Sequence, residues 1–473
     1  MSEALQHEAC ERFLAVVRKH MVDPKAPATA TVWSPTLECA PRERLRAIQE
    51  EKLAAAYDYL YACSPFYRQR FADAGLGPGD VRTLDDLRKV PVTRKLDWIP
   101  DFERHPPWGQ FSPLLDEHWS ARGWMVFSTS GTTRQPRLFR HTTHDRDAWA
   151  WMAARAMHSY GVRPGDVALN CFFYGPSVAA WGTHNGLNLL GCSVVPGGSM
   201  PSERRAAFVQ SVRPTVLLGT PSTLLTLGTR LTELGGSPAD SSVRLLVCAG
   251  EPGAAVASTK RRLEQMWNAR VHDDFGCTEA AQAPLGYTCT YEVEKDEGTV
   301  NVHLMEDTHI VEVLHPETFE PVPDGQRGTL VVTNLYSEAG PFLRYDLGDW
   351  IAVTKEPCPC GRTHARALGG LLGRNDHCLK IRGLQFFPST FEDAVRSIQE
   401  LGHEYRIEIG GDNHRDEVRI LAERAPGSDI ARDEVARRLR GVLGISVDVE
   451  LRDAGSLPRA EGKGARFVDH RNT

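Results

Sequence analysis

The sequence lacks the features that mark several large classes of protein. No stretch approaches roughly eighteen consecutive apolar residues, so there is no candidate for a membrane-spanning helix. A surplus of positive charge is also missing: 61 acidic residues against 55 lysines and arginines give a net charge of −6, which argues against nucleic-acid binding. Eleven cysteines are too few in 473 residues for a disulfide scaffold. The first residues, MSEALQHEACERFL, carry acids where a signal peptide carries basic residues and an apolar core, so we expect a cytoplasmic enzyme.

The pattern along the chain predicts more than one domain, and it changes near Val167 from helical to alternating strands and helices. A chain of 473 residues exceeds one ordinary hydrophobic core. Apolar positions at helical spacing predict a helix over residues 42–63, and Thr83 is a candidate helix N-cap. From Val167 onward, short apolar runs alternate with helical stretches, as in VALNCFF, SVVPGG, TVLLGTP and VRLLVCAG. This alternation predicts a parallel, helix-covered sheet with ligands at the carboxyl ends of its strands.

Two further regions are predicted in the C-terminal half. Residues 299–353 read as β-rich, with strands in HIVEVLHP, GTLVVTNL and WIAVT. A final α+β unit has strands in EYRIEIGG, EVRILAE and SVDVELR and helices over residues 389–401 and 429–443, and Gly369 and Gly370 are the expected joint. We therefore predict an α/β fold with a large N-terminal domain, residues 1–373, and a small, mobile α+β C-terminal domain, residues 374–473.

A hydroxyl-rich stretch, FSTSGTTRQPRLFRHT, raises the question of a phosphate site. Its STSGTT core is not a Walker loop, because no Gly-Lys-Ser/Thr follows at the required spacing. Hydroxyls and backbone N–H groups on a Gly-containing turn can still hold phosphates, although Ser/Thr-rich turns after strands are also common without a ligand. Five more segments follow in order: CAGEP, DDFGCTEA, LRYDLGDW, LLGRNDHCLKIRG and LPRAEGKGARFVDHR.

The order and spacing of these segments resemble the adenylate-forming superfamily of acyl- and aryl-CoA ligases, adenylation domains and luciferases. The resemblance covers nearly the whole chain and is strongest to the phenylacetate–CoA ligase branch. The segments typical of that branch are CSPFYRQRFADAGLGPGDVRTLDDLRKVPVTRK, CPCGRT, IRGLQFFPSTFEDAV and PRAEGKGARFVDHR.

The resemblance implies an ATP and Mg²⁺ site. Thr278 is expected at the α-phosphate and Glu279 at Mg²⁺, a hard cation that prefers carboxylate oxygen. Asp349 is expected to accept hydrogen bonds from the ribose hydroxyls, and Arg374 to reach the nucleotide. The implied phosphate loop is Ser128, Thr129, Ser130, Gly131, Thr132 and Thr133, and the implied adenine border is Ala249, Gly250, Glu251 and Pro252.

Two residues of the C-terminal region complete the implied machinery. Lys463, between two glycines, is expected to be the catalytic lysine, since an ammonium group can stabilise the charge that builds up as a carboxylate attacks the α-phosphate. Without the resemblance it would read as a solvated lysine in a tail loop. Asp376 matches the hinge about which the small domain rotates between half-reactions.

The sequence departs from the family pattern in three motifs. The phosphate loop has Arg134 and Gln135 where Gly and Lys are usual, and either Arg134 or Arg137 could supply the missing cation. Phe275 replaces a tyrosine, and Asp346 adds a carboxylate beside the expected ribose site.

The segment CPCGRT also raises a metal site. Alone, Cys358 and Cys360 could be a turn with two buried thiols, but Cys289 and His303 would complete a closed Cys₃His zinc site, and members of the branch resemble this pattern. His309 and His364 are the alternative ligands.

The acid pocket is expected where residues 171–186 meet the FGCTEA turn, with Gly276 in its wall. Phe173, Tyr174, Trp181 and Phe275 could form an aromatic box for a flat aryl acid, or could pack a helix onto the sheet. His184 could orient a polar substituent or be a hydrogen-bonded core histidine.

These observations favour ATP-dependent adenylation of an aryl or arylacetic acid, with release of pyrophosphate and transfer of the acyl group to CoA. Three alternatives remain open: the same adenylation with a carrier-protein thiol or an amine as acceptor, activation of nitrite to diazotise an aromatic amine, and a non-catalytic nucleotide-binding homologue. A carrier protein would have to be a separate chain, and the resemblance allows a homodimer.

Overall fold

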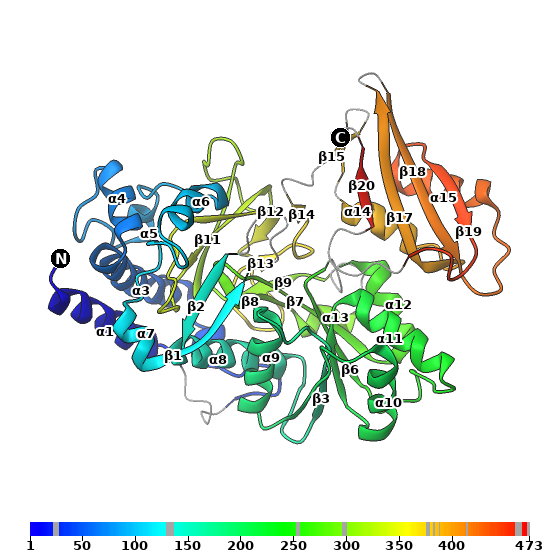
Figure 1. The fold of residues 1–473 in the computed structure, drawn as a ribbon, viewed down its shortest axis with the longest axis horizontal. Helices are drawn as coiled ribbons and strands as arrows, with labels where there is room; N and C mark the ends of the chain where they lie inside the picture. The colour runs from blue at the N-terminus through cyan, green and yellow to red at the C-terminus, as the bar shows by residue number, and fades with distance from the viewer. Residues whose placement is uncertain are drawn as a thin grey trace.

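A large N-terminal unit and a smaller C-terminal unit make up the chain in the computed structural model (Figure 1). The structure describes residues 1–21, 28–128, 137–251, 256–295, 300–374, 379–381, 384–386, 388–412, 415–458 and 466–470. The predicted α/β fold class, with a large domain and a small α+β domain, is confirmed. None of the helices in these ranges is long and apolar enough to cross a membrane.

The chain begins with a helical region, as predicted. The helix expected over residues 42–63 forms with these bounds, and Thr83 caps a short helix through a reciprocal capping box with Asp86. Ser64 accepts a hydrogen bond from the Tyr67 N–H and so begins the next helix. The helices are α1 (Glu3–Lys19), α2 (Pro35–Glu38), α3 (Arg42–Cys63), α4 (Pro65–Asp73), α5 (Leu84–Leu87), α6 (Lys95–Arg104) and α7 (Asp116–Arg122).

A parallel sheet follows a hairpin of β1 (Gly123–Ser128) and β2 (Leu138–Thr142). Its strands lie in the order β4-β3-β5-β6-β7, and four of them contain the four apolar runs predicted as strands. Because all these strands run the same way, the segments that follow β5, β6 and β7 meet at one edge of the sheet. The strands are β3 (Val167–Asn170), β4 (Ser193–Pro196), β5 (Val216–Gly219), β6 (Leu245–Ala249) and β7 (Arg270–Cys277). The helices are α8 (Thr143–Ser159), α9 (Val178–Leu189), α10 (Ser202–Val212), α11 (Pro221–Glu233) and α12 (Ala257–Trp267).

The predicted β-rich region is antiparallel and continues the same sheet. From β7 the order runs β8-β9-β13-β12-β11-β10, with β14 pairing at the middle of β12. The parallel and antiparallel parts therefore share one continuous sheet. The elements are β8 (Ala281–Thr288), α13 (Thr290–Lys295), β9 (Val302–Leu304), β10 (His309–Leu314), β11 (Arg327–Asn334), β12 (Tyr345–Thr354), β13 (Arg366–Ala367) and β14 (Gly373–Arg374).

The C-terminal unit has a separate core between a mixed sheet, in the order β19-β18-β17-β20, and two helices. The helix expected over residues 389–401 ends earlier, because Leu401 already pairs with Arg424 in the β17–β18 ladder. Arg374, assigned to the C-terminal domain in the sequence, pairs with Asp349 of β12, so we propose that the division between the domains falls after Arg374. The elements are β15 (Leu379–Ile381), β16 (Leu384–Phe386), α14 (Pro388–Arg396), β17 (Leu401–Asp412), β18 (Arg415–Arg424), α15 (Arg432–Leu443), β19 (Asp448–Arg452) and β20 (Phe467–Asp469).

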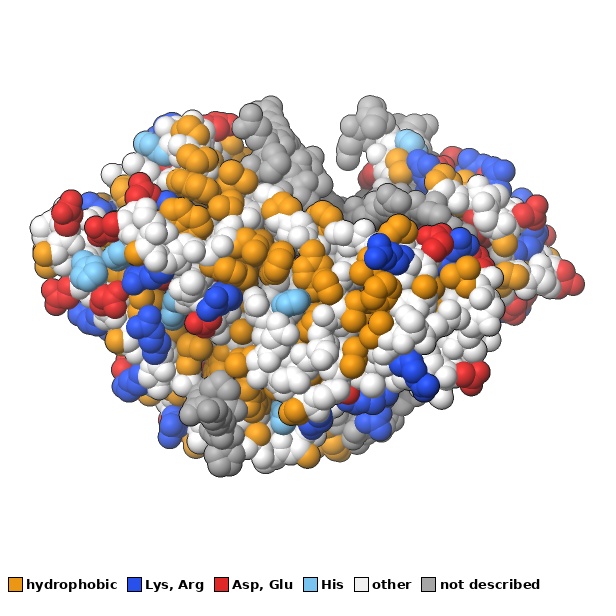
Figure 2. Space-filling view, turned by 60° about the horizontal axis from the view of Figure 1, so that its bottom comes forward, with side chains coloured by type: hydrophobic (Ala, Val, Ile, Leu, Met, Phe, Trp, Pro, Cys, Tyr) orange, Lys and Arg blue, Asp and Glu red, His pale blue; other side chains and the backbone are white. Residues whose placement is uncertain are grey.

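Hydrophobic and charged side chains are unevenly distributed over the molecular surface. On the face shown in Figure 2, hydrophobic side chains gather over the middle of the molecule, whereas charged side chains lie mainly toward the two ends. Exposed apolar groups in the described ranges include Phe173 and Leu96, which are 61% and 71% exposed.

Candidate active site and metal centre

The loop after β6 places the expected adenine border at the carboxyl edge of the parallel sheet. Ala249 ends β6, and Gly250 has a φ of +86°, which glycine adopts without strain. The Glu251 carboxylate accepts hydrogen bonds from the Ser222 hydroxyl at 2.7 Å and from the Ser222 backbone N–H at 3.3 Å. Because Ser222 lies in the first turn of α11, this carboxylate also faces the positive end of a helix. Glu251 is thus held in place by Ser222, a partner that was not predicted.

The structure brings Asp349 and Arg374 together. They pair across β12 and β14, with Arg374 Nη1 at 3.7 Å from Asp349 Oδ2 and donating to the Leu347 carbonyl at 3.0 Å. Gly348 has a φ of +73°, and a Cβ there would lie 3.3 Å from Arg374 Nη2, so glycine permits this close approach. Both side chains keep access to solvent, Arg374 at 41% and Asp349 at 15%. The pair can therefore receive a ligand from outside the sheet.

Asp346, expected to add a carboxylate beside the ribose site, lies in the turn that carries Asp349. Its Oδ1 accepts hydrogen bonds from the Thr329 hydroxyl at 2.7 Å and from the Gly348 N–H at 3.0 Å. Two donors from β11 and from the β12 turn thus occupy this carboxylate. Its role in the structure is to fix the turn that carries Asp349.

Thr278 and Glu279 lie in the turn between β7 and β8. The Glu279 carbonyl accepts a hydrogen bond from Gln282 Nε2 at 2.5 Å, and Gln282 Oε1 accepts one from the Tyr336 hydroxyl at 2.9 Å. Neither Gln282 nor Tyr336 was predicted to belong to the site. Both lie in strand-like patterns, where a polar residue looks the same whether it supports a turn or faces solvent.

Tyr345 is a buried residue near charged side chains from several segments of the site. Burial raises its pKa well above the usual range; the nearby Glu279 carboxylate raises it further, while Arg137 and Arg374 lower it. Charges from the β7–β8 turn, from the segment before β2 and from β14 therefore surround one buried phenol. Arg137 is one of the two arginines proposed to replace the missing loop lysine, and the structure places it among these groups.

Several predicted site residues lie outside the described residues. Of the implied phosphate loop, Ser128 is described: it ends β1, and its N–H donates to the Pro176 carbonyl at 2.9 Å. This bond ties the start of the loop to the segment of the expected acid pocket. The others outside the description are Thr129, Ser130, Gly131, Thr132, Thr133, Arg134, Pro252, Asp376 and Lys463.

The predicted aromatic box is divided in the structure. The rings of Tyr174 and Trp181 meet edge to face at 5.2 Å between centroids, and the Tyr174 hydroxyl lies 3.0 Å from His184 Nδ1. Burial raises the pKa of Tyr174 to about 12 and lowers that of His184, so both are neutral near pH 7. Phe173 instead is 61% exposed, and Phe275 packs with the hydrophobic cluster of the antiparallel strands, next to Gly276 near the end of β7. The structure thus groups Tyr174 and Trp181 with a histidine rather than with the two phenylalanines.

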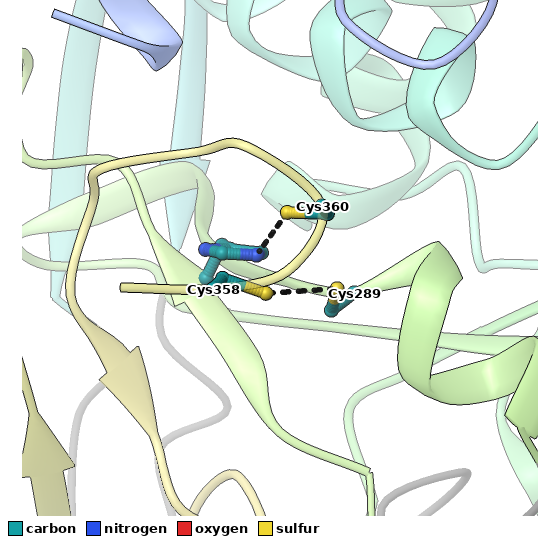
Figure 3. A group of neighbouring side chains, drawn as sticks. Cys289, Cys358 and Cys360 are labelled. Atoms are coloured by element: carbon teal, nitrogen blue, oxygen red, sulfur yellow. Dashed lines mark hydrogen bonds between the residues drawn. The ribbon is translucent and has the colours of Figure 1, made fainter. Parts of the chain in front are cut away.

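The four predicted metal ligands come together at one place in the large unit. Cys289 follows β8, His303 lies in β9, and Cys358 and Cys360 lie in the loop between β12 and β13 (Figure 3). Their ligand atoms all lie within 4.8 Å of one another. The alternative ligands are engaged elsewhere: His364 bonds to the Leu304 and Leu37 carbonyls.

The spacing of these atoms fits a tetrahedral zinc site. The Sγ atoms of Cys289 and Cys358 are 3.7 Å apart, and Cys360 Sγ lies 3.3 Å from His303 Nε2. Zn–S bonds of about 2.3 Å and Zn–N bonds of about 2.0 Å would place tetrahedral ligands roughly 3.3–3.8 Å apart. The loop is anchored by the buried Arg362, whose Nε donates to the buried Glu38 at 2.8 Å. A small ion therefore fits between ligands that the fold already holds.

Comparison with known proteins agrees with the two units. Residues 117–336 match the AMP-binding enzyme family, and residues 383–471 match the AMP-binding enzyme C-terminal domain. The phenylacetate-coenzyme A ligase of Thermus thermophilus is 34% identical over 457 residues, which cover 92% of this chain and 99% of the relative. The corresponding ligase of Pseudomonas putida is 31% identical and covers 92% of this chain and 96% of the relative.

A solved 2-hydroxyisobutyryl-CoA ligase is similar in structure. In its postadenylation state with R3-HIB-AMP, it is 28% identical to this chain, covers 95% of both chains and gives a TM-score of 0.87. In its thioesterification state with 2-HIB-AMP and CoA, it is 29% identical at the same coverage and gives a TM-score of 0.71.

Proposed function

The chain belongs to the AMP-binding, adenylate-forming enzymes as an acid–CoA ligase of the phenylacetate–CoA ligase type, and we propose that its acid is aromatic, an aryl or arylacetic acid. Such an enzyme joins an acid to ATP as an acyl-adenylate with release of pyrophosphate. The CoA thiol then attacks the acyl carbon, which gives the thioester and AMP.

The nucleotide side of the proposal rests on the charged edge of the sheet. Asp349, with Arg374 beside it, is positioned to accept hydrogen bonds from ribose hydroxyls. Thr278 and Glu279 would lie at the α-phosphate and at Mg²⁺, and the ion would offset phosphate charge. Ser128 would begin the phosphate loop, and the loop from Ala249 to Glu251 would border the adenine.

Lys463 is proposed from the resemblance as the catalytic lysine of adenylation. Negative charge grows on the α-phosphate oxygens and the leaving pyrophosphate as the carboxylate attacks. An ammonium group there stabilises the transition state more than the bound substrates, and so raises the rate.

The observation that carries the choice of acid is the edge-to-face pair of Tyr174 and Trp181, half-buried on α9 and the segment before it. Two rings at this angle offer an apolar wall to a flat ring, and the curated relatives act on phenylacetate. The Tyr174 hydroxyl and His184 beside it could also hold a polar substituent. This polar pair favours a second candidate, a 2-hydroxy acid, since the structural relative takes 2-hydroxyisobutyrate.

We propose that Cys289, His303, Cys358 and Cys360 hold a structural zinc ion. Four protein ligands leave no open position for a substrate, so the ion would link β9, the β8–α13 segment and the β12–β13 loop.

Pyrophosphate release with ATP and Mg²⁺ tests the proposal. Benzoate, phenylacetate, cinnamate and 2-hydroxyisobutyrate would each be supplied with and without CoA. We expect turnover with an aromatic acid that increases on addition of CoA. Preference for 2-hydroxyisobutyrate would replace the aromatic acid by the second candidate, and turnover with nitrite and an aromatic amine alone would overturn both.

A further inference from the structure

Two hydrogen bonds join the large unit to the C-terminal unit at helix α12. The Ser258 hydroxyl donates to Asp393 Oδ1 of α14 at 2.5 Å, and Arg262 Nη2 donates to the Leu401 carbonyl at the start of β17 at 2.7 Å. Figure 1 shows α14 above α12 at this junction. Ser258 is only 4% exposed, whereas Asp393 is partly exposed, so the bond between them is partly buried. A hydrogen bond to a charged acceptor is among the stronger polar contacts.

The same junction contains an unfavourable pair of charges. Burial and, to a smaller extent, the nearby Arg396 guanidinium lower the pKa of Arg262 to about 10. Arg396 is paired with Glu392 at 2.8 Å, whereas one terminal nitrogen of Arg262 is buried with no hydrogen-bond partner among the described residues. Like charges and an unsatisfied donor weaken the interface that the two hydrogen bonds hold. The contact between the two units is therefore favourable enough to form and weak enough to be reversible.

The junction also lies within electrostatic reach of the adenine border. The Glu251 carboxylate raises the pKa of both Glu392 and Arg396 of α14. In each case this effect is smaller than the effects of burial and of the Glu392–Arg396 pair. The Glu251 carboxylate therefore lies within electrostatic range of α14 and, on the proposed function, beside the nucleotide. Placement of α14 and occupancy of the nucleotide site are physically adjacent.

The position of the C-terminal unit matches one state of the structural relative better than another. The same relative, at 95% coverage of both chains, gives a TM-score of 0.87 in the postadenylation state and 0.71 in the thioesterification state with CoA. Since the relative is the same enzyme in both cases, the difference lies in its conformation. The α12–α14 junction of this chain accordingly belongs to an arrangement close to the first state.

We propose that Ser258 and Asp393 form a latch that holds the C-terminal unit in the arrangement of the postadenylation state, in which the acyl-adenylate is bound, and that opens before thioester formation. Arg262 supports the closed form through the Leu401 carbonyl, and its repulsion from Arg396 keeps the closed form reversible. Ser258 and Asp393 are thus positioning residues for the first half-reaction. This inference rests on the proposed function, because it assigns the junction to one of its two steps.

The test separates the half-reactions in Ser258→Ala and Asp393→Ala. Single-turnover pyrophosphate release without CoA follows adenylation, and rapid addition of CoA to preformed acyl-adenylate follows thioester formation. We expect each variant to slow adenylation by about tenfold, the effect of one hydrogen bond to a charged group, with no loss in the second step. Asp393→Asn keeps an oxygen that accepts from Ser258 and should retain most of the adenylation rate. Arg261→Ala, an exposed neighbour on α12, is the matched control.

A structural readout keeps the latch distinct from the choice of substrate. Hydrogen exchange of α12 and α14 amides and small-angle scattering need no acid at all. We expect Ser258→Ala to exchange faster in both helices and to change the scattering profile, whereas Arg261→Ala should match the unsubstituted protein. If both half-reactions slow equally, or if exchange and scattering do not change, the latch is wrong. If no tested acid is turned over but the exchange and scattering change as expected, the proposed substrate fails while the junction stands.

Discussion

The proposed metal cluster and the pair of Asp349 and Arg374, here called the nucleotide edge, are both built from residues in or beside β-strands. The polar groups of the two regions differ in how far they are open to solvent. The cluster gathers four ligand atoms within 4.8 Å inside the large unit, and three of its four residues are buried. At the nucleotide edge, Asp349 and Arg374 lie 3.7 Å apart and remain partly open to solvent. Side chains that bind a shared ion stabilise the fold, whereas charged side chains that are partly exposed to solvent can contact a ligand. Substitutions in the two regions should therefore separate stability from activity.

The largest expected effect on activity comes from Lys463, which we propose as the catalytic lysine. Lys463→Ala should slow adenylation by roughly 10²–10³-fold, the loss expected for one charge-stabilising donor at the transition state. The melting temperature should not change. Single-turnover pyrophosphate release measures the rate, and Lys463→Arg tests whether charge without the same geometry suffices. Full activity in Lys463→Ala would remove this residue from the mechanism.

The largest expected effect on stability comes from the metal cluster. Cys358→Ser or Cys360→Ser should lose the bound metal and about 4 kcal/mol of unfolding free energy, because loss of a structural metal belongs to the most destabilising changes. Metal analysis and thermal unfolding check this result. Cys39→Ser, a half-buried cysteine outside the cluster, is the control and should keep its metal. Unchanged metal content in the cluster variants would show that the four residues are not ligands.

A smaller effect is expected for Asp349→Asn. The amide keeps the shape of the side chain but loses the charge that strengthens hydrogen bonds from ribose hydroxyls. We expect kcat/KM for ATP to fall by about tenfold to a hundredfold, mainly through KM, with little change in stability. Initial rates over a range of ATP concentrations give both constants. An equal loss for every substrate, with a lower melting temperature, would instead point to damage to the β12 turn.

The last prediction concerns Asp274 in β7 and the pH dependence of the free energy of unfolding. Burial raises the pKa of Asp274 to about 7, above the value of about 3.9 in an unfolded chain. Between these values the folded chain keeps a proton that the unfolded chain releases, so this group's contribution to stability is intact below about pH 4 and is lost as the pH rises toward 7.

Asp274→Asn cannot ionise and should remove this pH dependence. Relative to the unsubstituted protein, the variant should gain about 3 kcal/mol of unfolding free energy between pH 4.5 and 7.5. Urea unfolding at the two pH values measures the change. The same difference between the proteins at both pH values would show that Asp274 does not hold a proton in the folded state.

Local sequence determined most of the secondary structure and the composition of the metal cluster. The helix over residues 42–63, the Thr83 cap and the four apolar strands form as predicted, since they depend on periodicity and turn residues within short windows. The cluster could be named because cysteine and histidine are few and chemically distinct. The fold class and the family followed from the order of motifs along the chain.

Tertiary structure alone decided which residues are neighbours across long separations. The aromatic box could not be judged from sequence, because Phe173 and Tyr174 are adjacent in the chain but only Tyr174 packs against Trp181. Asp346 was expected beside the ribose site, but its donor Thr329 comes from β11, 17 positions away. The contact between Ser258 and Asp393 spans 135 positions and two domains, so no local pattern encodes it. Periodicity and caps act over a few residues and are readable in sequence, whereas these contacts depend on how whole elements pack.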